Sequence, residues 1–119
     1  MLRRVGFFRE FRGVGAPSLV DAQSGVSFDR RAQSYLQGGT VLVAVPGVIT
    51  WPETGRVLCA GHIRTDGEWC WPEELSFLVV TNRLLLPPEF LLRMESLNWV
   101  APSIPLDELA ALEHEVSAV

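Results

Sequence analysis

The sequence predicts a single α+β domain over residues 1–119, in which a small antiparallel sheet of about three strands packs against four or five helices. The length of 119 residues is that of one domain. Apolar residues recur at helical spacing near both ends of the chain, whereas the middle carries short, β-branched apolar runs bounded by glycine and proline. This order of helices, strands and helices is typical of the α+β class.

Two helices are predicted before the sheet. Residues 1–12 alternate weakly, and a strand and a short helix are both compatible with them. A proline at the start and a glycine beyond the end indicate a short helix over about 17–23. Ser27 or Asp29 can cap a second helix, which Gly38–Gly39 ends. Its apolar stripe comprises Phe28, Ala32, Tyr35 and Leu36.

Three helices are predicted after the sheet. Pro72 is a favoured first residue, and Glu73 and Glu74 suit the positive end of the helix dipole. The same start, a proline followed by a glutamate, opens a helix at residue 88. An amphipathic helix over 106–117 follows, and its predicted inward residues are Leu106, Leu109, Ala110, Leu112 and Val116.

The predicted sheet is built from three segments. Val41–Val45 is apolar at every position and largely β-branched, which predicts a strand buried on both faces. The loop that follows is compatible with a short strand extension at Val48–Thr50. Residues 56–64 form the second predicted strand and residues 68–71 the third.

The stretch TDGEWCWP, residues 65–72, determines the expected register of the hairpin. Asp66–Gly67 is a strong signal for a two-residue turn, because glycine adopts positive φ without a steric penalty. With this turn, Arg64 lies opposite Trp69 and His62 lies opposite Trp71. Side chains alternate along a strand, so both tryptophans are expected on one face of the hairpin.

The cysteines are expected on the other face and in the reduced state. Cys59 and Cys70 lie about four positions apart along the ladder, which at ~3.3 Å per residue places them outside disulfide reach. His62 points away from both, so the three or four convergent ligands of a zinc site are missing. The sequence contains no nucleophile elbow, P-loop or dinucleotide fingerprint. We therefore expect no enzyme activity, no catalytic residues, no metal and no cofactor.

The tryptophan face allows two interpretations. In the first, Trp69 and Trp71 fill the core beneath a helix, and Arg64 lies over Trp69 as a cation–π pair. In the second, the ladder is partly open and binds a partner, because tryptophan and arginine are enriched at binding hot spots. The candidate binding residues are then His62, Arg64, Glu68, Trp69 and Trp71.

Composition excludes some partners. The net charge is −4 and the arginines are scattered, whereas nucleic-acid binders carry a concentrated basic face. No apolar run reaches the ~18–20 residues that span a bilayer, and charges interrupt the start too early for a signal peptide. We therefore expect no nucleic acid, no membrane and a cytoplasmic location. The mean hydropathy of +0.21 favours apolar surface that a second chain covers.

Several motifs resemble those of a family of small uncharacterised actinobacterial proteins. These are FFREF, APSLVDA, YLQGGTVLVAVPG, TDGEWCWPEELSFLV and LPPEFLLRM, which together cover most of residues 5–94. In that family a Tyr-Leu-x-x-Gly segment precedes a buried strand, and a Thr-Asp-Gly-x-Trp-x-Trp motif leads into a helix. After Phe77 this chain departs from the family pattern, with LVVTNRLLL in place of a stretch bearing tyrosine and histidine. The resemblance implies no particular activity.

These observations lead to three functional hypotheses. The first is a small, non-catalytic protein-interaction module that forms a homodimer, favoured by the apolar strand, the positive hydropathy and the aromatic hairpin. The second is an immunity-type protein that neutralises a toxin by covering its active site. The third is a small-ligand pocket lined by Trp69, Trp71 and Arg64.

Overall fold

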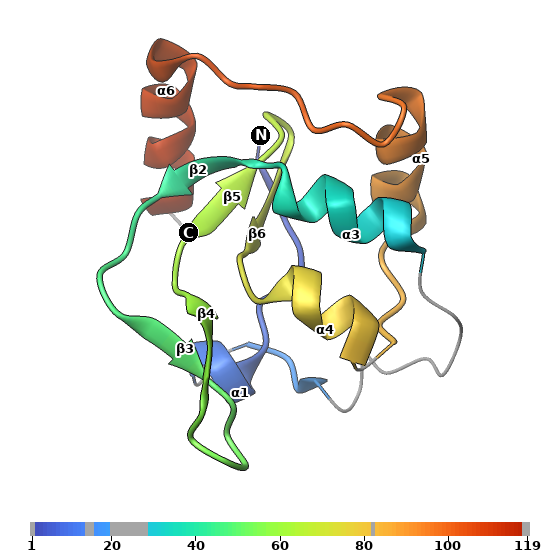
Figure 1. Ribbon diagram of the computed structural model, residues 1–119. Coiled ribbons are helices and arrows are strands. Elements are labelled where there is room, and N and C mark those ends of the chain that lie inside the picture. Colours follow the sequence, from blue (N-terminus) through green and yellow to red (C-terminus); the bar gives the residue numbers. More distant parts are fainter. Residues whose placement is uncertain (1, 14–15, 20–28, 82, 118–119) are drawn as a thin grey trace.

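The computed structural model describes residues 2–13, 16–19, 29–81 and 83–117 (Figure 1). Helices and strands are mixed along the chain, and the predicted α+β class is confirmed. The helices are α1 (Arg9–Arg12), α3 (Arg30–Gln37), α4 (Leu75–Thr81), α5 (Pro88–Ser96) and α6 (Leu106–Ser117). The strands are β1 (Arg3–Arg4), β2 (Thr40–Val43), β3 (Val48–Thr50), β4 (Val57–Ala60), β5 (Ile63–Thr65) and β6 (Trp69–Pro72).

The strands form two sheets rather than the one that the sequence predicts. The larger has the order β1-β6-β5-β2, and β1 runs parallel to β6 while the other pairs are antiparallel. Residues 1–12 therefore contain both a strand and a short helix. The smaller sheet consists of β3 and β4, and it extends from the larger one as an arm (Figure 1).

The arm exists because one long hairpin is broken in its middle. Its first half runs from β2 into β3 and its second half from β4 into β5, so the strand predicted over 56–64 is divided at Gly61 and His62. At the break the backbone N–H of Val45 donates to Nδ1 of His62 at 3.1 Å. An imidazole nitrogen thus takes the place of a ladder carbonyl.

The helices test the predicted boundaries. The second helix is confirmed as α3, whose N-cap Asp29 accepts a hydrogen bond from the backbone of Arg31. Within its stripe Ala32, Tyr35 and Leu36 are buried, whereas Phe28 lies outside the described residues. The helix predicted over 17–23 also falls largely outside them. The helices predicted at 88 and over 106–117 are confirmed as α5 and α6.

Three local predictions are wrong. The helix after the sheet begins at Leu75 and not at Pro72, because Pro72 is the last residue of β6. The segment Val41–Val45 is not buried on both faces, since only Leu42 in it is buried. Leu106 is 85% exposed and Ala110 is exposed as well, although both were predicted to face inward. The two are four residues apart and lie on the same face of α6, whereas Leu109 and Leu112 contact the smaller core cluster.

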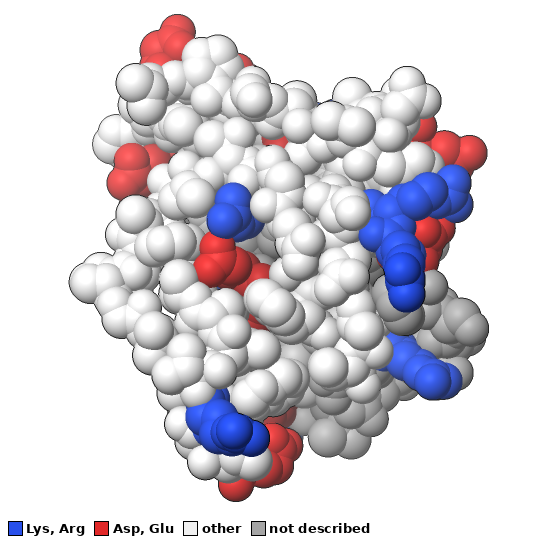
Figure 2. Space-filling model, in the orientation of Figure 1, with Lys and Arg blue, Asp and Glu red and all other residues white. Residues whose placement is uncertain are grey.

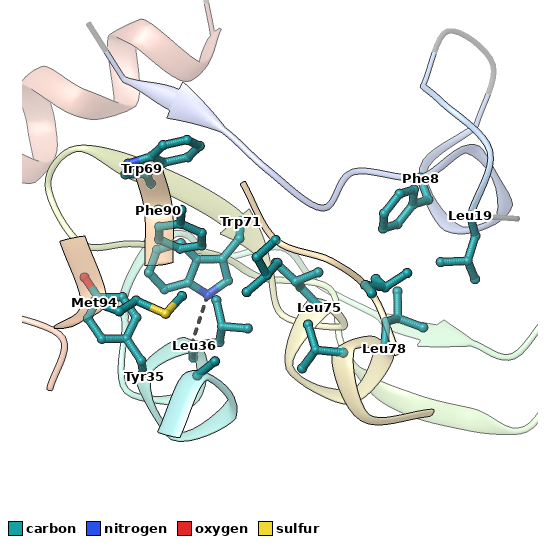
Figure 3. Close-up of a cluster of buried hydrophobic side chains, with 14 residues drawn as sticks. Phe8, Leu19, Tyr35, Leu36, Trp69, Trp71, Leu75, Leu78, Phe90 and Met94 are labelled. Carbon is teal, nitrogen blue, oxygen red and sulfur yellow. Dashed lines mark hydrogen bonds between the residues drawn. The ribbon is translucent and has the colours of Figure 1, made fainter. Parts of the chain in front are cut away.

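The core has two parts on opposite faces of the larger sheet. The larger cluster lies beneath α3, α4 and α5 and includes Trp69, Trp71 and Phe90 (Figure 3). The smaller cluster contains Leu42, Cys70 and Leu112 of α6. Adjacent residues of β6 therefore enter different clusters, as the alternation of side chains along a strand requires.

Candidate functional site

The hairpin β5–β6 has a different turn from the predicted one. Thr65 lies opposite Cys70 and Arg64 opposite Trp71, so the register differs by two residues from the prediction. The two loop residues are Gly67 and Glu68, and Gly67 has a φ of +95°. A glycine at the first loop position is what a type II′ turn requires. Both tryptophans lie on the same face, as predicted, because they are two residues apart on β6 and side chains alternate along a strand in any register.

Asp66 directly precedes the two loop residues, and its carboxylate links the turn to the helices. It is 1% exposed. Oδ1 accepts hydrogen bonds from the backbone N–H groups of Glu68 and Trp69 at 2.9 and 2.7 Å. Oδ2 accepts from the hydroxyl of Tyr35 at 2.5 Å and from Nε of Arg93 at 2.9 Å. One side chain therefore joins the hairpin to α3 and α5. Burial, followed by the bond to Asp66, raises the pKa of Tyr35.

Core filling is confirmed as the role of the two tryptophans. Trp69 and Trp71 are 3% and 1% exposed, and both lie against Phe90 with ring centroids 4.8 and 5.4 Å away. Nε1 of Trp71 donates to the carbonyl of Leu36 at 3.0 Å (Figure 3). In this conformation neither indole is accessible to a partner.

The other candidate residues do not join the tryptophans in one surface. Arg3, rather than Arg64, lies over the ring of Trp69, at 4.0 Å from its centroid. The imidazole of His62 is engaged at the break in the long hairpin. Glu68 is exposed at the turn and pairs with Nη1 of Arg93 at 3.0 Å. The predicted site residues are therefore divided among the core, the break in the long hairpin and the β5–β6 turn.

The two glutamates after β6 lie directly before α4, near the helix start that the sequence predicts for them, and each also pairs with an arginine. Glu74 is fully buried, and Nε and Nη2 of Arg12 donate to its two oxygens, each at 2.7 Å. Nε and Nη2 of Arg64 both donate to Oε1 of Glu73, at 3.1 and 2.8 Å. The first pair fixes α1 to the start of α4, and the second holds Arg64 at the surface.

An open cleft of about 330 Å³ lies between β4 and α4. One wall is β4 and the other is the segment from Glu73 to Phe77. Arg64 and Glu73 contribute the charged end, and near the middle of Figure 2 basic and acidic atoms lie beside each other in a hollow. Sequence patterns missed this cleft, because it depends on the break in the long hairpin.

The β3–β4 arm has one covered and one exposed face. Trp51, which follows β3, packs against Phe11 of α1 with ring centroids 6.1 Å apart. Val48 and Val57 are 57% and 65% exposed. They lie on the same face, because Val57 pairs with Thr50, two residues after Val48. A hollow at the tip is lined by Trp51, Glu53, Thr54, Arg56 and Val57.

The cysteines are free thiols in unreactive surroundings. Cys70 is fully buried and Cys59 lies in the wall of the cleft. Burial, opposed by Arg4 and assisted by Asp66, raises the pKa of Cys70 to about 11. Burial and the nearby Glu74 raise the pKa of Cys59 to about 12. Both are protonated at neutral pH, whereas a nucleophilic cysteine reacts as the thiolate. Within the described residues no three metal-ligating side chains converge.

Because of these thiols, the free energy of unfolding is expected to depend on pH in the alkaline range. For Cys70 the folded pKa of about 11 exceeds the ordinary value of 9.0, so its contribution is complete below pH 9.0 and is lost as pH rises to about 11. We expect the free energy of unfolding to decline above pH 9, as urea titrations under reducing conditions can measure. Cys70→Ala should flatten that decline. An equal decline in this variant would contradict the assignment.

No protein-family profile matches the chain, and no curated protein or solved structure is significantly similar to it. The resemblance to a family of actinobacterial proteins therefore stays a prediction. Among the described residues no helix has both the length and the apolar character that crossing a bilayer demands. The geometry of the site is thus the basis for the functional proposals.

Proposed function

We propose that the chain is a non-catalytic, cytoplasmic protein-interaction module that forms a homodimer through the β3–β4 arm. The observation that carries the proposal is the pair of exposed valines, Val48 and Val57, on one face of the arm. A two-stranded ribbon has little stability alone, and apolar side chains on it gain when a partner covers them. Two free thiols suit a reducing compartment.

The charges at the tip of the arm support a partner of the same sequence. Glu53 and Arg56 are exposed, and neither forms an ion pair within the described part of the chain. In a two-fold interface each residue of one copy meets its counterpart reciprocally. Glu53 of each copy can therefore pair with Arg56 of the other.

We expect the purified chain to be a dimer at tens of micromolar, as sedimentation velocity can measure. Glu53→Arg places like charges together twice in a two-fold interface and should weaken the dimer about tenfold or more. The charge swap Glu53→Arg with Arg56→Glu should restore it. Val57→Asp should also abolish dimerisation, because it buries an unpaired charge.

The matched control is Leu92→Asp on α5, where the leucine is 65% exposed away from the arm. It adds the same charge to a similarly exposed apolar position and should leave the dimer intact. A monomer at tens of micromolar would overturn the dimer proposal, and so would a dimer that the arm variants do not affect.

A further inference from the structure

One edge of β4 is unpaired among the described residues, on the side where β6 pairs with β5 in the larger sheet. β5 has β2 on one side and β6 on the other, whereas β4, earlier in the same broken strand, pairs only with β3. β6 ends at Pro72, and the backbone N–H of Glu73 then donates to the carbonyl of His62 at 2.9 Å. Beyond this bond the chain turns into α4. The edge of β4 is left without a strand among the described residues.

The cleft occupies that missing position. Leu58, Cys59 and Ala60 of β4 line one side, and Glu73, Ser76 and Phe77 line the other. β4 has four residues, which at ~3.3 Å per residue gives an edge long enough for a short extended segment. Native proteins commonly cover the edge strands of their sheets, or place charges or prolines on them, because an open edge is a template for pairing with another chain.

The alternative edge of the arm is bounded by prolines, which makes the edge of β4 the more accessible one. β3 is flanked by Pro46 and Pro52, and proline cannot donate a ladder hydrogen bond. The segment from Arg56 to Gly61 contains no proline. The two prolines therefore limit how far an added strand could extend along β3, and no proline sets such a limit along β4.

The charged end of the cleft contains the ion pair of Arg64 and Glu73, and one oxygen of that pair is left for a basic ligand. Both donors that Arg64 offers to Glu73 go to Oε1, and Nη1 of Arg64 donates to the carbonyl of Gly39 at 2.6 Å. Oε2 of Glu73 has no hydrogen bond to the described residues and remains an acceptor in the cleft. The opposite wall is apolar, with Leu58 and Phe77. A cationic side chain on an extended backbone matches both features.

We propose that this cleft binds an extended peptide segment of another protein as a strand added to β4, with a lysine or arginine of that segment on Glu73. Backbone hydrogen bonds to the strand edge supply affinity in this mode, and alternate side chains supply specificity. The site is separate from the tip of the arm. Its peptide binding does not require the homodimer, so each proposal can fail alone.

The probe is a phage-displayed library of random decapeptides, selected on the full chain, with the enriched peptides resynthesised and measured by fluorescence polarisation. We expect the enriched peptides to contain a lysine or arginine, flanked by residues whose preferences alternate along the sequence as in a β-strand. N-methylation should abolish binding at every second backbone position, because alternate N–H groups face the strand. Nuclear magnetic resonance shifts should concentrate on residues 58–60 and 73–77.

Two variants test the charged contact. Glu73→Gln should weaken a basic peptide about tenfold, the loss of one charge-assisted contact. Gln37→Arg, which adds a positive charge at the exposed rim of the cleft without removing a buried partner, should weaken it in the same direction. The matched control Glu113→Gln changes an exposed glutamate on α6 and should have no effect.

Three results would overturn the proposal. They are a selection that enriches no peptide, peptides whose N-methylation shows no alternation, and shifts in the cleft produced by small-molecule fragments but by no peptide. If Glu73→Gln and Gln37→Arg both bind the peptide as strongly as the unmodified chain does, the basic contact at Glu73 is excluded. The dimer is measured separately by sedimentation, so a monomer that binds peptides leaves this proposal standing.

Discussion

Replacing Asp66 with alanine is expected to lower the free energy of unfolding by about 3–5 kcal/mol, the usual cost of removing one member of a buried ion pair. The carboxylate is the shared acceptor for two backbone N–H groups, the Tyr35 hydroxyl and the Arg93 guanidinium. Without it these donors face one another with no acceptor. Urea unfolding followed by far-UV circular dichroism measures the loss.

Tyr35→Phe distinguishes the contribution of the Tyr35 hydrogen bond from that of the Asp66–Arg93 ion pair. It removes one donor and leaves the Asp66–Arg93 pair, so the expected cost is smaller, about 1.5–3 kcal/mol. Glu113→Ala, at an exposed position of α6, should change stability by less than about 0.5 kcal/mol. If Asp66→Ala costs no more than Glu113→Ala, Asp66 is only a turn residue, as its sequence context suggests.

That contrast shows how far local patterns reach in the hairpin. Asp-Gly is a turn signal on local grounds, but Gly-Glu satisfies the type II′ requirement equally well. The choice depends on Tyr35 and Arg93, which lie 31 and 27 residues away from Asp66. The shared face of Trp69 and Trp71 was nevertheless predictable, because residues two apart on one strand point to the same side whatever the register.

The break in the long hairpin shows what local patterns could not predict. Residues 56–64 form an uninterrupted strand pattern, and only the glycine at 61 weakens it. In the structure, guanidinium nitrogens of Arg12 lie 3.5 Å from the carbonyl of Gly61, and the same side chain holds the buried Glu74. A residue on α1 thus contacts the point where the sheet divides. The arm and the cleft both result from this division.

The helices were more predictable because their signals are local. Asp29 as a cap and Pro88 as a first residue mark the ends of α3 and α5 within one or two residues. Pro72 carries the same signal and misled, because a proline also suits the end of a strand that lacks a further ladder partner. Glu73 and Glu74 still directly precede the helix, and they also pair with Arg64 and Arg12.

Trp71→Ala is expected to lower the free energy of unfolding by about 3–5 kcal/mol, the range for truncating a large buried aromatic side chain. Trp71 contacts Tyr35 and Phe90 and donates to the carbonyl of Leu36. Little can collapse into the space, since a methyl group built on Gly39 would already lie 2.5 Å from Cζ2 of the indole. Urea unfolding of the purified variant measures the change.

Trp51→Ala is the matched control, because it removes the same side chain from the half-buried position beneath the arm. Its expected cost is about 1–2 kcal/mol, since much of the indole keeps contact with water in the folded state. Equal losses in the two variants would mean that the arm is as firmly packed as the core. A larger loss at Trp51 than at Trp71 would contradict the assignment of the TDGEWCWP tryptophans to the core. A small loss at Trp51 would identify the arm as the part of the fold that a partner stabilises most.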